Sequence, residues 1–165
     1  MSLSSAATSG RVRLGPFDAP AALGRSGRVA CKREGDGATP IGRWRLLEVY
    51  YRPDRVMRPT TGLPVRRITR DAGWCDAAGD RNYNRKVRVP YPASHERLWR
   101  DDHLYDLVVV LDHNQRPRIR GHGSAIFLHC ARPGLTPTEG CVALPRAELQ
   151  RLLRLVRKDA LLIVG

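Results

Sequence analysis

The sequence lacks the residue patterns of several common functional classes. It has four cysteines but no CxxC pair, and their spacing matches no zinc finger or zinc ribbon, so we expect no metal site. The longest apolar runs, 107–111 and 160–164, reach five residues, whereas a membrane-spanning helix needs roughly 20. The opening residues MSLSSAATSG carry no basic segment followed by an apolar one. We therefore expect neither a membrane span nor an export signal.

Negative charge is also scarce. Lys and Arg outnumber Asp and Glu 29 to 16, which gives a net charge of +13, and the basic residues are spread along the whole chain. Such a field attracts polyanions. No C2H2 spacing, basic helix or aromatic ribonucleoprotein motif accompanies the charge, so we expect no specific nucleic-acid partner. An anionic cell envelope is an equally good partner, and a compositional bias toward arginine needs no partner at all.

Glycine and proline, in contrast, are plentiful. The 165 residues include 15 Gly and 12 Pro, and 42% are hydrophobic, which is typical of a turn-rich globular protein and not of a coiled coil or a disordered chain. A chain of this length fits one domain. We predict a flexible leader over residues 1–10 and a single domain over residues 11–165.

Local patterns predict mainly strands. The segment 104–111, LYDLVVVL, is apolar enough to be a strand covered on both faces. Leucines and a valine at helical spacing after Pro145 predict one helix over 145–158. The remaining predictions are short strands within 10–37, strands at 41–51, 124–129 and 160–164, an extended loop region at 52–92, and a short helix at 93–100.

The chemistry concentrates in SAIFLHCARPGLTPTEGCVAL. His129 closes an apolar strand, and Cys141 follows twelve positions later. A free thiol titrates near ~8.5, so a nucleophilic cysteine needs a neighbour that removes its proton, and imidazole does so. Gly140 leaves the backbone open, so that a carbonyl could approach N–H groups aimed at its developing oxyanion. A histidine satisfied at a strand end and a small buried cysteine would have the same local sequence, so the spacing alone leaves both interpretations open.

Several separated segments together resemble one family. They are KREGDGATPIGRW at 32–44, the pair RNYNR and YPASHERLW, and the site itself, with His129, Thr138, Gly140 and Cys141. Over roughly 32–164 the chain resembles the catalytic domain of the L,D-transpeptidases, the YkuD-like family, in particular its short, compact bacterial branch.

The resemblance implies a mostly β, sandwich-like fold with a few short helices and no cofactor. In that family a cysteine is acylated by a peptidoglycan tetrapeptide stem, D-Ala is released, and an amine of a second stem attacks the thioester. Cys141 would be the nucleophile, His129 the acid and base, and the Gly140 and Cys141 amides candidates for the oxyanion hole. The resemblance further implies a cell-envelope location and covalent inhibition by carbapenems, while the missing export signal leaves a cytoplasmic location open.

Three features depart from the family pattern. Glu139 stands where the motif has histidine, and a nearby carboxylate opposes thiolate formation unless it points away or pairs with a cation such as Arg132 or Arg146. The loop between His129 and the cysteine is shorter than usual. Ala143 replaces an arginine that could hold a substrate carboxylate.

Further residues are candidates for supporting roles. His122 is a second possible base, although it precedes the apolar strand. Tyr83, Asn84 and His95, together with Thr138 and Glu139, are candidates to line the substrate cleft, or merely to cap the sheet. Cys130 should face away from His129 if the strand persists.

Three functions of different kinds remain open at this point. Transpeptidation leads. Hydrolysis of the same acyl-enzyme, as in an L,D-carboxypeptidase or cysteine peptidase, differs only in that water replaces the amine. The third is a noncatalytic basic protein that binds cell wall or nucleic acid, which the charge and the altered motif favour.

Overall fold

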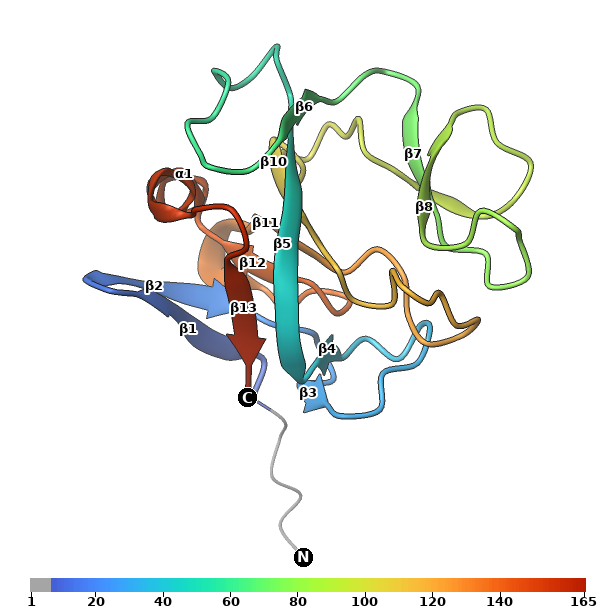
Figure 1. Cartoon of the computed structure of the whole chain (residues 1–165), viewed down its shortest axis with the longest axis horizontal. Coiled ribbons are helices and arrows are strands. Elements are labelled where there is room, and N and C mark those ends of the chain that lie inside the picture. Colours follow the sequence, from blue (N-terminus) through green and yellow to red (C-terminus); the bar gives the residue numbers. More distant parts are fainter. Residues whose placement is uncertain (1–6) are drawn as a thin grey trace, which may run out of the picture.

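A computed structural model describes residues 7–165. It is mostly β, as predicted, with one α-helix among the described residues (Figure 1). The elements are β1 Ser9–Leu14, β2 Phe17–Ala22, β3 Arg28–Val29, β4 Thr39–Pro40, β5 Gly42–Tyr51, β6 Val65–Arg67, β7 Ala72–Cys75, β8 Arg85–Arg88, β9 His95–Arg97, β10 Leu107–Leu111, β11 Phe127–Cys130, the 3-10 turn Pro133–Leu135, β12 Val142–Leu144, α1 Arg146–Leu155 and β13 Leu161–Val164.

The main sheet has the strand order β1-β2-β12-β11-β10-β5-β13, and β6 adds to β5. β11 and β12 are parallel neighbours, whereas β10 pairs with β11 and β5 in antiparallel fashion. A separate three-stranded sheet has the order β8-β7-β9. In Figure 1 this small sheet lies on one side of β5, and the β1–β2 hairpin and α1 lie on the other.

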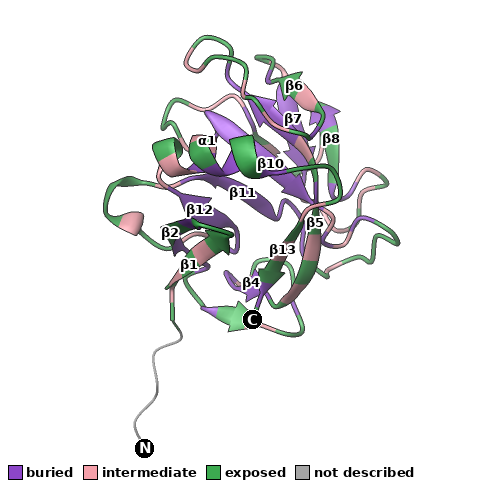
Figure 2. Cartoon of the chain, turned by 60° about the vertical axis from the view of Figure 1, so that its left-hand side comes forward, coloured by how far each residue is buried: buried purple, intermediate pink, exposed green. Residues whose placement is uncertain are grey.

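The central strands are buried on both faces. Along β11, Leu128 and Cys130 belong to one apolar cluster, and Phe127 belongs to the other. The first cluster is covered by α1, and the second contains aromatic residues such as Trp74 and Tyr105. Figure 2 shows the central strands β10, β11 and β12 in the colour of buried residues. All five residues of β10 are buried, which confirms the predicted two-sided cover. Each fully buried Leu or Val contributes roughly 1.5–3 kcal/mol.

Helix α1 forms as its pattern predicts. Leu149, Leu152 and Leu153 are buried against the sheet, and Pro145 precedes the first turn. Glu148 lies in the first turn and Arg154 in the last, where the helix dipole favours negative and positive charge respectively. The helix ends at Leu155, three residues before the predicted end, because the next residue turns to an extended conformation.

Other predicted elements need correction. The helix predicted at 93–100 is wrong, because residues 95–97 form β9 and pair with β7. The strand predicted at 124–129 starts only at Phe127, because Ala125 has a φ of 52°. The loop region 52–92 contains the short strands β6, β7 and β8. Residues 1–6 of the predicted leader lie outside the described residues, and β1 already begins at Ser9.

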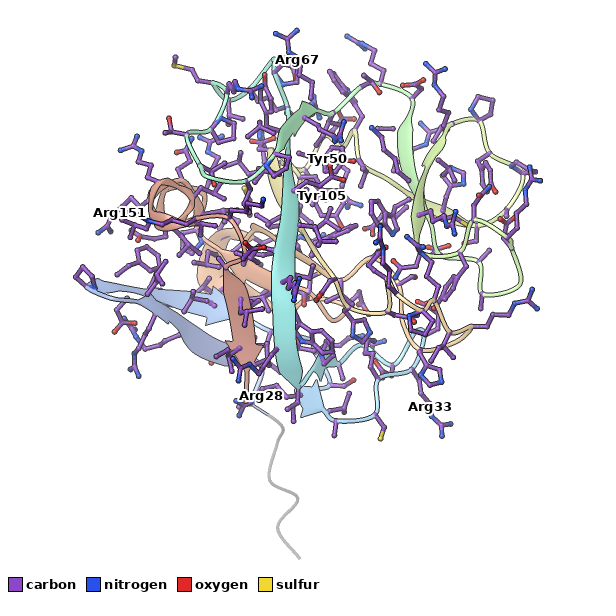
Figure 3. The ribbon with its side chains drawn as sticks, in the orientation of Figure 1. Arg28, Arg33, Tyr50, Arg67, Tyr105 and Arg151 are labelled. Atoms are coloured by element: carbon purple, nitrogen blue, oxygen red, sulfur yellow. The ribbon has the colours of Figure 1, made fainter. Side chains whose placement is uncertain are left out.

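The excess positive charge is distributed over the surface. Figure 3 places Arg28, Arg33, Arg67 and Arg151 at separate edges of the molecule. Within residues 7–165, no helix has the length and apolarity to cross a membrane, and no group of histidine, cysteine and acidic side chains suits a metal ion.

Candidate active site

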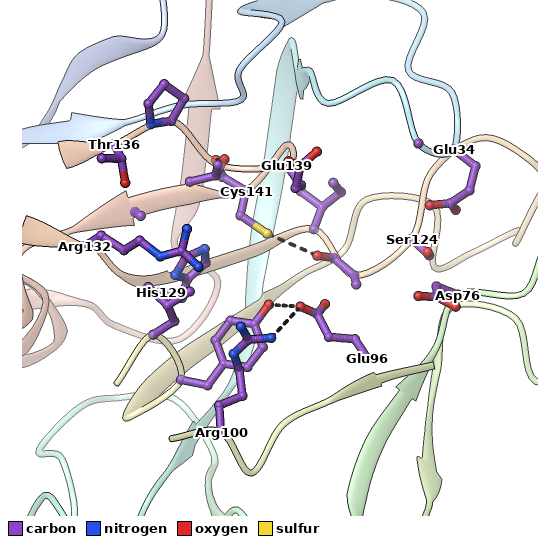
Figure 4. A pocket seen from close by; sticks show the side chains of 18 of the residues that line it. Glu34, Asp76, Glu96, Arg100, Ser124, His129, Arg132, Thr136, Glu139 and Cys141 are labelled. Atoms are coloured by element: carbon purple, nitrogen blue, oxygen red, sulfur yellow. Dashed lines mark hydrogen bonds and ion pairs between the residues drawn. The ribbon is translucent and has the colours of Figure 1, made fainter. Parts of the chain in front are cut away.

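A cleft of about 430 Å³ brings the two residues of the predicted pair together. Cys141 and His129 both line it, the first immediately before β12 and the second on β11 (Figure 4). The parallel pairing of these strands places His129 opposite Ala143, two residues beyond the cysteine. The sheet therefore holds both residues on neighbouring strands.

The Cys141 thiol is buried and hydrogen-bonded. It donates to the carbonyl of Ala125 at 3.2 Å and accepts from the Phe127 N–H at 3.4 Å. Burial, together with the charge of Glu96, raises the pKa of Cys141 to about 12, while the Phe127 N–H and the Lys32 ammonium act in the opposite direction. The resting cysteine is therefore a neutral thiol.

Hydrogen bonds to two threonines fix the backbone around Cys141. The Thr138 hydroxyl donates to the Cys141 carbonyl at 2.6 Å and accepts from the Gly140 N–H at 3.1 Å. Thr39 Oγ1 also approaches the Cys141 carbonyl, at 3.4 Å. Because the Gly140 N–H is used in this way, it does not point into the cleft as an oxyanion donor would.

His129 is buried and held in one tautomer. Its Nδ1 lies 2.9 Å from the Cys130 carbonyl, and a carbonyl only accepts, so Nδ1 carries the proton and Nε2 is an acceptor. The ring packs edge-on against Tyr105, with 5.3 Å between ring centroids. Burial lowers the pKa of His129 to about 4. Both members of the predicted pair are thus neutral, and no hydrogen bond joins them in this structure.

The depressed pKa of His129 predicts acid sensitivity. The unfolded chain binds a proton at residue 129 near pH 6.5, whereas the folded chain does so only near pH 4. Its contribution is therefore fully present above pH 6.5 and is lost as the pH falls toward 4, by about 3 kcal/mol at most. Urea unfolding at pH 7 and pH 4.5 should show a smaller loss of stability for His129→Gln than for wild type. Equal losses would contradict a neutral buried imidazole.

Glu139 points toward a different cation from those expected. It is largely exposed and pairs with Arg25 at 2.7 Å, whereas Arg132 and Arg146 pair with Asp102 and Asp106. The carboxylate that opposes the Cys141 thiolate is instead Glu96, which was not among the predicted site residues.

The remaining predicted residues divide between the cleft and its support. Asn84 does not line the cleft. Its Oδ1 accepts from Trp74 Nε1 at 2.9 Å and from the Ala125 N–H at 3.1 Å, so it holds the residue whose carbonyl accepts from Cys141. Tyr83 is buried and donates its hydroxyl proton to Glu34, a residue of the cleft.

The two other histidines predicted for the site lie outside the cleft lining. His95 Nδ1 donates to the Ala93 carbonyl at 2.8 Å. His122 is exposed, and its carbonyl lies 2.9 Å from Nε2 of His113. The structure therefore does not bring His122 to Cys141 as a second base.

Several charged residues of the cleft were not among the predicted site residues. Glu96 accepts from the Tyr105 hydroxyl at 2.5 Å and lies 3.7 Å from Arg100. Lys32 is buried and bonded to Asp36 and to the Arg33 carbonyl. Arg100 and Arg132 line the cleft together with Ala143 and supply guanidinium groups there, although neither lies at the predicted position.

Comparison with known families agrees with this geometry. The model of the L,D-transpeptidase catalytic domain, YkuD, matches residues 8–164. The chain belongs to the L,D-transpeptidase family. The match extends the resemblance, first visible over 32–164, to nearly the whole chain, and it confirms both the predicted family and the mostly β fold. No curated protein and no solved structure matches significantly. Membership indicates an L,D-transpeptidase-type catalytic domain with a general connection to peptidoglycan.

Proposed function

We propose that the protein is a peptidoglycan L,D-transpeptidase that uses Cys141 as nucleophile and His129 as acid and base. The observation that carries this proposal is the shared cleft, in which Cys141 stands near a histidine whose Nε2 is unprotonated. Family membership supports the same reaction class. The proposal includes a role at the cell envelope.

The resting protonation states favour proton transfer coupled to attack. The thiol proton passes to His129 Nε2 as sulfur bonds to the carbonyl carbon of the stem peptide. The imidazolium then gives this proton to the leaving amine, so D-Ala departs and a thioester remains. An acceptor amine attacks the thioester, His129 removes its proton, and the same proton returns to the thiolate. Because burial disfavours both charged forms, a stable thiolate–imidazolium pair before substrate binding is not part of the proposal.

The arginines of the cleft suit the leaving group. D-Ala departs with a free carboxylate, and guanidinium groups bind carboxylates in a bidentate manner. Arg100 and Arg132 line the cleft on the same side as His129 (Figure 4). Arg100 already holds Asp102 through Nε and Nη2. Arg132, which lies 3.7 Å from the same carboxylate, is the freer of the two for the contact that Ala143 cannot make.

The test uses the wild-type protein and a synthetic tetrapeptide stem. Intact mass should show an adduct equal to the donor minus D-Ala, and free D-Ala should accumulate. An amine acceptor should then give a cross-linked product. Release of D-Ala with no such product at any acceptor concentration would identify a carboxypeptidase. The absence of adducts with both the stem and a carbapenem would contradict acyl transfer and favour a binding protein.

A further inference from the structure

One end of the cleft is acidic, although the protein is strongly basic. Glu34, Ser124 and Asp76 gather there, at the end opposite His129 and Arg132 (Figure 4). Glu34 and Asp76 take part in none of the ion pairs found among residues 7–165. Lys32 also lines the cleft, but its ammonium is bound to Asp36.

Two buried oxygens at this end have no hydrogen-bond partner among the described residues. They are Asp76 Oδ1 and Ser124 Oγ. Ser124 is only 7% exposed and lines the cleft. Its hydroxyl is placed to donate to the Tyr83 oxygen, whose own proton goes to Glu34, so Tyr83 offers no donor to Ser124 Oγ. Buried polar atoms are normally satisfied, and an unpaired one costs free energy that a donor group on a ligand would recover.

We propose that this end of the cleft binds an ammonium group of the acyl-donor stem peptide, with Asp76 and Ser124 accepting its hydrogen bonds. Glu34 adds negative charge beside them. An ammonium group supplies three donors and a positive charge, and neither Glu34 nor Asp76 has a cation as partner among the described residues. The inference rests on the proposed function, because it assigns part of the substrate of that same site.

The chemistry of the bound amine decides that it is not the attacking group. Carboxylates stabilise an ammonium ion and so keep a bound amine protonated. A protonated amine has no electron pair with which to attack a thioester. The amine held by Asp76 is therefore a recognition group. In the proposed reaction an amine of a second stem attacks, so stems carry an amine, and the donor stem brings the same group into the cleft.

This assignment fixes the direction of the donor. Cys141 lies between the acidic end and the side that holds Arg100 and Arg132 (Figure 4). A donor with its ammonium at Asp76 and its terminal carboxylate at the arginines places the bond to D-Ala over the thiol. The reversed donor would bring like charges together at both ends.

The test compares two donors that differ in one charge. One tetrapeptide carries lysine before D-Ala, and the other carries the same lysine with its Nζ acetylated. Release of the first D-Ala per enzyme is measured, because this step precedes any attack by an acceptor and a lysine donor that acts as an acceptor in later turnovers does not contribute. Binding is measured by calorimetry. For wild type, acetylation should lower kcat/KM and affinity roughly tenfold to a hundredfold, as expected for the loss of a charged hydrogen bond.

Three variants locate the effect. Asp76→Asn and Ser124→Ala should each bring the ratio between the two donors toward one. Asp71→Asn is the matched control, because Asp71 lies at the other end of β7 and pairs with Arg88 on the surface. It should keep the wild-type ratio. Asp71→Asn should also keep the wild-type rate of carbapenem acylation, and circular dichroism spectra that match wild type should show that each variant is folded.

The outcomes separate this inference from the proposed function. Turnover of both donors with the same ratio in wild type and Asp76→Asn would overturn the ammonium site and leave acyl transfer intact. No turnover, but tighter binding of the lysine donor that depends on Asp76, would keep the site and overturn acyl transfer. Neither turnover nor a binding preference would overturn both.

Discussion

Replacement of Cys141 by alanine should abolish the covalent adduct that the wild-type protein forms with a carbapenem. The substitution removes the only sulfur that lines the cleft among the described residues. A carbapenem opens by acylating a nucleophile, so the expected change in intact mass is complete loss. The fold should persist, because alanine retains Cβ and loses one buried sulfur atom.

The other cysteines provide the controls for this experiment. Cys31 is exposed, whereas Cys130 is buried in the apolar cluster on the opposite face of β11 from His129. Cys31→Ser and Cys130→Ala should both keep the adduct. An adduct that survives in Cys141→Ala and vanishes in Cys31→Ser would show that surface reactivity, not the cleft, produced it.

Replacement of His129 by glutamine should slow acylation of Cys141 by about 10²–10⁴-fold, the usual contribution of a positioned general base. Glutamine can still donate to the Cys130 carbonyl, so the substitution removes proton transfer while retaining a polar group on β11. The rate constant for acylation is measured in a single turnover, by recording the intact mass of the protein at successive times after a carbapenem is added. The adduct should still form at long times, unlike in Cys141→Ala.

His122→Gln is the matched control for His129→Gln. His122 is exposed and absent from the lining of the cleft, so its replacement should leave the acylation rate within about twofold of wild type, as surface substitutions usually have small effects. A large loss in His122→Gln with none in His129→Gln would reverse the assignment of the base. Equal rates for all three proteins would show that solvent removes the thiol proton.

The parts of the fold that local sequence determines could be predicted. The continuous apolar run of β10 requires cover on both faces, and the leucine spacing of α1 requires one buried stripe. β9 could not be predicted, because its three residues form a strand only through pairing with β7, about twenty positions away. Short segments of this kind take their conformation from tertiary contacts.

The residues of the candidate site also fall into two groups, those that a local motif identifies and those that only the folded structure brings to the cleft. Cys141 and His129 stand close in the sequence and within one recognisable motif, so they could be proposed together. Glu96 lies in β9, and Asp76 and Arg100 lie just after β7 and β9, in segments where nothing local distinguishes a cleft residue from a surface residue. Asn84 was a candidate to line the cleft or merely to cap the sheet, and its buried side chain accepts from the Ala125 N–H. The sequence could not decide between these roles, because the position of Asn84 depends on loops that are distant from it in the sequence.

Because β11 and β12 are parallel neighbours, the residues that react are held by the sheet, and the residues at the entrance of the cleft are held by a separate loop. Parallel neighbours require a crossover connection, and here residues 131–141 provide it while also forming part of the cleft rim through Arg132, Thr136 and Glu139. The ladder, and not this connection, sets the position of the cysteine relative to the histidine. Gly134, at the tip of the crossover, has open space around it. Insertions there would reshape the entrance and change which stems are admitted, while the reacting pair stays in place, so this loop is where new substrate ranges can evolve or be engineered.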